Sequence, residues 1–94
     1  MKARFTHLFQ PGQIGTLELP NRIIKAPQMT GMSNSDGSVT ERLARHYKEI
    51  ALGGTGLITV ESAYIDNSAS KSATCQLGIS SDEHIPGLAW LTEI

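Results

Sequence analysis

The sequence predicts an α/β fold, because strand-like and helix-like segments alternate along the chain. Three observations support this: a hairpin pattern near the start, two short runs rich in β-branched residues, and a helical pattern after each run. A strand, a helix and a second strand in this order favour parallel neighbouring strands, since parallel strands need a crossover connection and a helix usually provides it. The pattern alone does not distinguish an open sheet from a closed barrel.

The first predicted element is a hairpin. Residues 13–14 and 17–19 flank Gly15-Thr16, and two residues including glycine between short alternating runs are typical of a tight turn. A strand is predicted over residues 22–26, and it ends at Pro27, which cannot donate to a sheet. Residues 30–38 are rich in Gly, Ser, Asn and Asp, which indicates a loop.

A helix is predicted after this loop. Ser38-Val39-Thr40-Glu41 has the spacing of a capping box, in which Ser38 accepts a hydrogen bond from a first-turn amide and Glu41 reaches back; Thr40 is the alternative cap. An apolar stripe recurs at helical spacing, formed by Leu43, Tyr47, Ile50 and Ala51. Gly53 and Gly54 are expected to end the helix.

The glycine run at residues 53–56 is not expected to be a phosphate-binding loop. Such a loop leads from a strand into a helix, so that the amides at the helix N-terminus face the anion. Here the glycines follow a helix and enter a strand, which is typical of a helix end and a tight turn.

The second strand is predicted over residues 57–60, a nearly continuous apolar run of the kind that is buried on both faces in a parallel sheet. A long polar loop is expected over residues 64–79. A final helix is predicted to begin at Ser80 or Ser81 and to tolerate Pro86 in its first turn. Its apolar residues are Leu88, Ala89, Trp90 and Leu91.

Composition excludes several classes of protein. The 94 residues are 39% hydrophobic and 18% charged with a net charge of -1, which excludes a disordered or collagen-like chain and gives no sign of a nucleic-acid partner. No run approaches the ~20 apolar residues of a membrane span, and residues 1–7 lack the apolar core of a secretory signal. Cys75, the single cysteine, cannot form an internal disulfide, which favours a cytoplasmic setting. We expect Cys75 to be a bystander thiol.

The candidate binding site lies after the two strands, because ligands of α/β folds bind beyond the carboxyl ends of the strands. This rule selects residues 26–30 and residues 61–63. Neither run offers an acid–base pair, a metal-ligand cluster or a Ser-His-Asp set. Small residues with accessible amides suit a flat cofactor, which needs an apolar floor and a few donors at its rim.

Other polar residues have simpler explanations. His7 and His46 are expected at the surface, and His84 is expected to have a capping or structural role at a helix start. Glu61 is expected to form an ion pair with Lys25 or Arg22 on the neighbouring strand, because a buried carboxylate needs a partner. By the same argument, Lys25 is a partner rather than a nucleophile.

Three segments carry a resemblance to a known family. They are "LFQPGQIGTLELPNRIIKAPQMT", "DGSVTERLARHYKEIALGGTGLITVES" and "LGISSDEHIPGLAWLTE". In this order and spacing, the chain resembles the N-terminal part of the Old Yellow Enzyme family of NADH:flavin oxidoreductases. The resemblance implies a (β/α)8 TIM barrel with non-covalent FMN. Residues 1–94 would then be an incomplete N-terminal part of one barrel domain, a hairpin plus two βα units, with the hairpin closing the barrel bottom.

The resemblance also implies which residues hold the flavin. Its ring edge would rest on Ala26, Pro27, Gln28 and Met29. The position that tunes the flavin is either Met29, by ungapped counting from Asn21, or Thr30, which we favour because a hydroxyl can donate a hydrogen bond and a thioether cannot. Ser62 would be a further contact. Gly31 and Met32 stand where a shorter subgroup has an aromatic residue, so the substrate preference is not implied.

The implied activity belongs to a longer protein. NADH or NADPH would reduce FMN, and the flavin would pass a hydride to an activated alkene or another small-molecule acceptor. The family's catalytic residues, and an iron–sulfur cluster where relatives have one, would lie beyond Ile94, since a barrel needs ~250 residues. We therefore expect the isolated chain to be inactive. A homo-oligomer is compatible with this, and the alternative is a small non-catalytic βαβ binding or assembly module.

Overall fold

The computed structural model describes residues 5–94 and has the predicted alternation of strands and helices. Residues 1–4, the start of the segment that we do not expect to be a secretory signal, lie outside this range. The elements are β1 (Gly12–Ile14), β2 (Leu17–Leu19), β3 (Ile24–Lys25), α1 (Glu41–Leu52), β4 (Leu57–Ile58), the 3₁₀ helix η1 (Asp82–His84) and α2 (Ile85–Glu93). The order predicted from the sequence is therefore confirmed.

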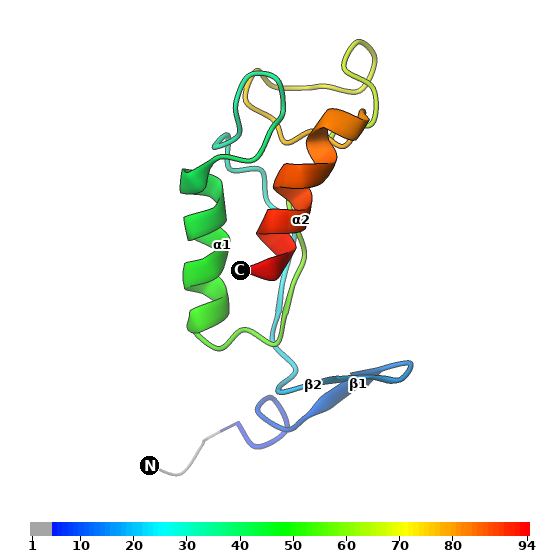
Figure 1. Cartoon of the computed structure of the whole chain (residues 1–94). Helices are drawn as coiled ribbons and strands as arrows, with labels where there is room; N and C mark the ends of the chain where they lie inside the picture. The colour runs from blue at the N-terminus through cyan, green and yellow to red at the C-terminus, as the bar shows by residue number, and fades with distance from the viewer. Residues whose placement is uncertain (1–4) are drawn as a thin grey trace.

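The hairpin forms as predicted. Strands β1 and β2 pair antiparallel, with Gly12 opposite Leu19 and Ile14 opposite Leu17. The hairpin lies at one end of the molecule, away from both helices (Figure 1). The loops between β3 and α1 and between β4 and α2 gather at the opposite end.

Strands β3 and β4 form the expected parallel pair, with Ile24 beside Leu57 and Lys25 beside Ile58. Both are shorter than predicted. At the start of the predicted first strand, the Arg22 amide donates to the carbonyl of Leu8 at 2.9 Å and the Ile23 amide donates to Asn21 Oδ1 at 3.0 Å, so neither amide donates to β4. Burial on both faces is also wrong for this chain: Ile24 is 53% exposed and Val60 is 37% exposed.

Helix α1 is capped by Thr40, and the preferred capping box on Ser38 is wrong. The Thr40 hydroxyl accepts a hydrogen bond from the Leu43 amide at 3.0 Å. Ser38 is occupied one turn earlier, where its amide and hydroxyl both donate to Asp36 Oδ1. The apolar stripe is buried over the first two turns, at Leu43, Ala44 and Tyr47, whereas Ala51 in the last turn is exposed.

The glycines at residues 53–56 end the helix and turn the chain, as expected. The Gly53 amide donates to the carbonyl of Glu49 at 3.0 Å. Asn21 Nδ2 donates to the carbonyl of Gly54 at 2.6 Å. A Cβ on Gly56 would lie 2.7 Å from the backbone carbonyl oxygen of Asn21, so only glycine allows this close approach. The run is a structural connection between α1 and β4.

The loop over residues 64–79, which the sequence predicts to be polar, contributes buried apolar side chains to the interior. Tyr64 and Leu77 are each 1% exposed. Tyr64 pairs with Gly78 in an isolated parallel bridge, and its amide donates to the carbonyl of Leu77 at 3.0 Å. Ser81 precedes η1, and α2 follows with Pro86 in its first turn, as predicted.

The core is small and the exposed surface is large. The buried cluster joins α1, α2 and the second loop through Leu43, Ala44, Tyr47, Leu77 and Leu91. The structure exposes 6649 Å² of surface, whereas a compact protein of its mass exposes about 5,300 Å². Its radius of gyration is 15.5 Å, against about 12.4 Å for a compact domain of this length. Over residues 5–94, no helix has the length and apolarity that crossing a bilayer requires.

Candidate functional site

The structure brings the two predicted strand ends together. The Thr30 amide donates to Glu61 Oε2 at 2.6 Å, and the Thr30 hydroxyl lies 3.0 and 2.9 Å from the two oxygens of the same carboxylate. Glu61 is 4% exposed. The turn after β3 and the segment after β4 are therefore joined by one buried side chain.

The ion pair expected for Glu61 does not form. Lys25 Nζ donates to the carbonyl of Ala26 at 3.0 Å, and Arg22 Nε donates to the carbonyl of Pro11 at 3.4 Å. Within residues 5–94, no lysine or arginine lies at ion-pair distance from Glu61. An amide and a hydroxyl satisfy this carboxylate instead, and neutral donors are sufficient because they reach both of its oxygens.

Tyr47 completes this arrangement from α1. Its hydroxyl accepts a hydrogen bond from the Glu61 amide at 2.9 Å, and the residue is 5% exposed. Burial, with the nearby Glu61 charge, raises the pKa of Tyr47 above its ordinary value, although the hydrogen bond from Glu61 opposes this. Sequence reasoning placed Tyr47 only in the apolar stripe. The Tyr47 hydroxyl could have indicated this polar contact, because a buried tyrosine usually has a hydrogen-bond partner.

Residues 26–29 form an exposed edge beside this buried link. Ala26, Pro27 and Gln28 are exposed, and Met29 is 39% exposed. No group in residues 5–94 accepts a hydrogen bond from the Gln28 or Met29 amide. This edge therefore offers both apolar contact area and unused backbone donors.

Thr30 is placed differently from Met29. Its hydroxyl hydrogen is directed to Glu61, and its hydroxyl oxygen accepts from the Met32 amide at 3.2 Å. A hydroxyl has one hydrogen to donate. The Thr30 hydroxyl, which we expected to donate to a flavin ring, therefore donates to Glu61 instead.

The end of β4 is held by a second polar residue. Ser62 is exposed, and Gln76 Nε2 lies 3.3 Å from its carbonyl and 3.4 Å from its hydroxyl. Gln76 is 2% exposed, and its Oε1 accepts from the Ser72 amide at 2.7 Å. Nothing in the local sequence pattern distinguished Gln76 from the other polar residues of the loop.

The histidines lie outside this site. His84 has the expected structural role: it is 7% exposed, and its Nε2 donates to the carbonyl of Asp36 at 2.7 Å. His46 is half-buried and His7 is exposed. Across residues 5–94, no three His, Cys, Asp or Glu side chains are grouped as a metal site would require. Cys75 is half-buried.

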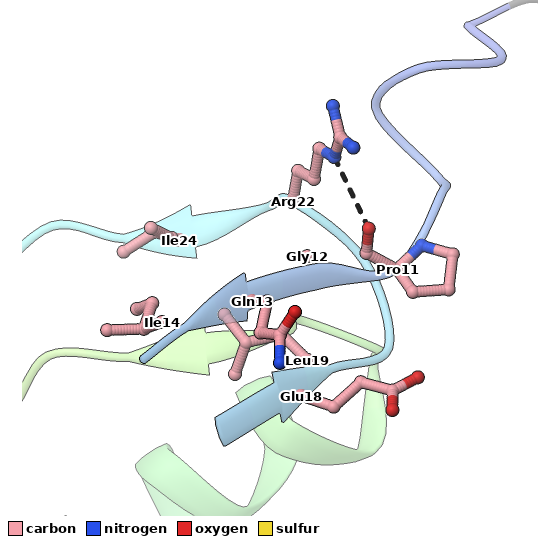
Figure 2. Close-up of a pocket in the computed structure, with 8 residues that line it drawn as sticks. All are labelled: Pro11, Gly12, Gln13, Ile14, Glu18, Leu19, Arg22 and Ile24. Atoms are coloured by element: carbon pink, nitrogen blue, oxygen red, sulfur yellow. Dashed lines mark hydrogen bonds between the residues drawn. The ribbon is translucent and has the colours of Figure 1, made fainter. Parts of the chain in front are cut away.

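A groove of about 650 Å³ lies elsewhere (Figure 2). It runs between the hairpin and β3, with Ile14, Leu19 and Ile24 on its walls and Arg22 at its rim. This groove is at the amino end of β3, whereas ligands of α/β folds bind at the carboxyl ends. We therefore place the candidate site at the strand ends and not in the groove.

The strand-end site suits the binding of a flat ring. Its exposed part provides apolar atoms and free amides, and its buried part holds the turn in shape. The residues described there include no acid–base pair positioned for hydrolysis. These are the properties that a planar cofactor requires from one wall of its site.

Residues 7–94 match the model of the NADH:flavin oxidoreductase / NADH oxidase family. The chain is 40% identical over 89 residues to the NADH oxidase of Thermoanaerobacter brockii, covering 95% of this chain and 14% of that protein. It is 41% identical over 87 residues to the NADPH dehydrogenase of Bacillus subtilis (strain 168), covering 92% and 25%.

Solved structures share its fold. A 2-naphthoyl-CoA reductase in complex with 2-naphthoyl-CoA has a TM-score of 0.90 at 27% identity, covering 95% of this chain and 14% of that one. The old yellow enzyme from Trypanosoma cruzi has a TM-score of 0.84 at 28% identity, covering 97% and 24%. The chain thus spans between 14% and 25% of the length of these four proteins.

Proposed function

Because the chain belongs to the NADH:flavin oxidoreductase / NADH oxidase family, we propose that it forms the first, FMN-holding part of an NAD(P)H-dependent oxidoreductase barrel. Residues 1–94 are then an incomplete part of one domain. The observation that carries the proposal is the exposed edge at residues 26–29, which lies at the carboxyl end of β3 and has unused amides. The large exposed surface supports the same view, because Ile24 and Val60 would be covered in a complete barrel.

The proposed contacts with FMN lie on both strand ends. Ala26, Pro27, Gln28 and Met29 support one edge of the ring, and Ser62 contacts it from the end of β4. We assign the tuning position to Met29 and not to Thr30, because the Thr30 hydroxyl donates to Glu61. The flavin ring then meets a thioether, which cannot donate a hydrogen bond.

These residues bind and orient the cofactor. FMN, when bound, accepts a hydride from NADH or NADPH and passes it to an activated alkene or another acceptor. The free amides of Gln28 and Met29 are available to donate to the ring edge, and the apolar atoms of Met29 exclude water from it. The proton donor and the substrate clamp are supplied by residues outside this chain.

A chimeric protein tests the proposal. Residues 7–94 would replace the matching segment of the Bacillus subtilis NADPH dehydrogenase, with which this chain shares 41% identity. We expect the chimera to bind FMN and to oxidise NADPH with an activated alkene as acceptor. A folded chimera that does not bind FMN would refute the proposal and favour a non-catalytic module.

A substitution in the chimera tests the assignment of Met29. Met29→Thr introduces a hydroxyl donor beside the ring, which stabilises the electron-rich reduced flavin and raises its reduction potential. Ile65→Thr, which changes a residue 71% exposed and outside the strand ends, is the matched control. An equal potential in both variants would contradict the assignment.

A further inference from the structure

We propose that Glu61 is the positioning residue of the flavin site, because its carboxylate fixes the turn at the end of β3 in the shape that receives the ring. This inference rests on the proposed function. Glu61 itself is buried and does not need to touch the cofactor. Its effect is transmitted through Thr30, the residue that follows the exposed edge.

Glu61 holds both the backbone and the side chain of Thr30. The amide donates to Oε2 at 2.6 Å, and the hydroxyl is within 3.0 Å of both oxygens. A hydrogen bond to an ionised acceptor is about twice as strong as one between neutral groups. Fixing the Thr30 amide also fixes the peptide plane that follows Met29, so the exposed edge is restrained at its last residue.

Glu61 is itself held in place by a residue of α1. Its amide donates to the Tyr47 hydroxyl at 2.9 Å, and Tyr47 belongs to the buried cluster of α1. The turn after β3 is therefore connected through Glu61 to the core. The paired part of the two strands cannot provide this restraint, because each contributes only two residues and the pairing ends at Lys25 and Ile58.

The Glu61 carboxylate has no salt-bridge function in the part of the chain that the structure describes. No lysine or arginine of residues 5–94 lies at ion-pair distance from it. A buried carboxylate without a cation depends on its hydrogen-bond donors. Thr30 supplies its side-chain and backbone donors, so the interaction that stabilises the charge is the same one that shapes the turn.

Variants in the chimera separate positioning from general stability. Glu61→Ala removes both acceptors, and we expect FMN affinity to fall at least tenfold, which corresponds to about 1.4 kcal/mol. Glu61→Gln can retain an acceptor oxygen facing Thr30, and we expect a loss below threefold. Thr30→Val removes only the hydroxyl and should lie between them, whereas Thr30→Ser should restore binding. Glu49→Ala and Thr92→Val change exposed residues and serve as matched controls.

The readout is the affinity and the visible absorption spectrum of bound FMN, measured with the melting temperature of each variant. Equal FMN affinity in the chimera and in its Glu61→Ala variant would overturn the positioning role and leave the proposed function intact. A chimera that never binds FMN would overturn the proposed function itself.

Amide hydrogen exchange tests the role of Glu61 without FMN. We expect Glu61→Ala, or Thr30→Val if the first variant does not fold, to accelerate exchange at Thr30 but not at Leu43, whose amide donates to Thr40. Unchanged exchange at Thr30 would also overturn the inference.

Discussion

Replacing Tyr47 by Phe removes a single oxygen from the buried link between α1 and the end of β4. That oxygen accepts a hydrogen bond from the Glu61 amide at 2.9 Å. No other group in residues 5–94 accepts from this amide. The substitution therefore leaves a donor unpaired beside residues that are 4% and 5% exposed.

The expected cost can be compared with that of Tyr64→Phe. Leaving a buried donor unpaired costs about 1–3 kcal/mol of unfolding free energy. The Tyr64 hydroxyl donates to the carbonyl of Asp36 at 2.9 Å, but His84 Nε2 donates to the same carbonyl at 2.7 Å. The carbonyl keeps a partner in Tyr64→Phe, so only the net value of one hydrogen bond is lost, about 0.5–1.5 kcal/mol.

Urea unfolding of the chain, followed by circular dichroism, measures both variants. The aromatic ring is retained in each, so the packing contribution is the same and the difference reports the unpaired donor. We expect Tyr47→Phe to lose more stability than Tyr64→Phe. A loss below about 0.5 kcal/mol for Tyr47→Phe, or a larger loss for Tyr64→Phe, would show that the Glu61 amide does not depend on this hydroxyl.

Three further predictions concern the same chain. Burial and the Glu61 charge raise the pKa of Tyr47 above its ordinary value of 10.0, so the stabilising contribution of the protonated Tyr47 hydroxyl is complete below pH 10 and is lost as the pH rises through the folded-state pKa. The urea midpoint should therefore fall more steeply above pH 10 in the wild type than in Tyr47→Phe, and equal slopes would contradict this. Gly37→Ala should lower the unfolding free energy by about 2–5 kcal/mol, because φ at Gly37 is 85° and the new Cβ would overlap the Tyr64 hydroxyl. Gly15→Ala, with φ 58° and open space around the new Cβ, should cost only the backbone strain of about 1–2 kcal/mol. Equal urea midpoints for the two variants would refute the clash. The isolated chain should not quench FMN fluorescence with submicromolar affinity, because it supplies only part of a barrel; such an affinity would contradict the proposal.

Local features of the sequence were sufficient for the order of the elements. The Gly15-Thr16 turn, the break at Pro27 and the helix-ending glycines each act within a few residues, and the structure confirms all three. The resemblance to the Old Yellow Enzyme family is confirmed as well, since the family model covers residues 7–94. The fold class follows from both.

The contacts of the candidate site were less predictable. Glu61 was expected to pair with Lys25 or Arg22, because charge complementarity was the signal that chose a partner for it. Its donors belong instead to Thr30, which is 31 residues away and carries no charge. The choice of Thr40 over Ser38 as the cap of α1 failed for a similar reason, since Asp36 competes for Ser38 through a turn that the capping pattern does not include.

The separation between Thr30 and Glu61 also affects the order of folding. Their contact closes a loop of 31 residues that contains the whole of α1, at an entropic cost of about 3 kcal/mol for an unstructured loop. We therefore expect the contact to form late, after the crossover helix has shortened the path between the strands. We expect the turn at residues 26–30 to be among the last parts of this chain to reach its native shape, and the cofactor to meet a prepared surface only once Glu61 is in place.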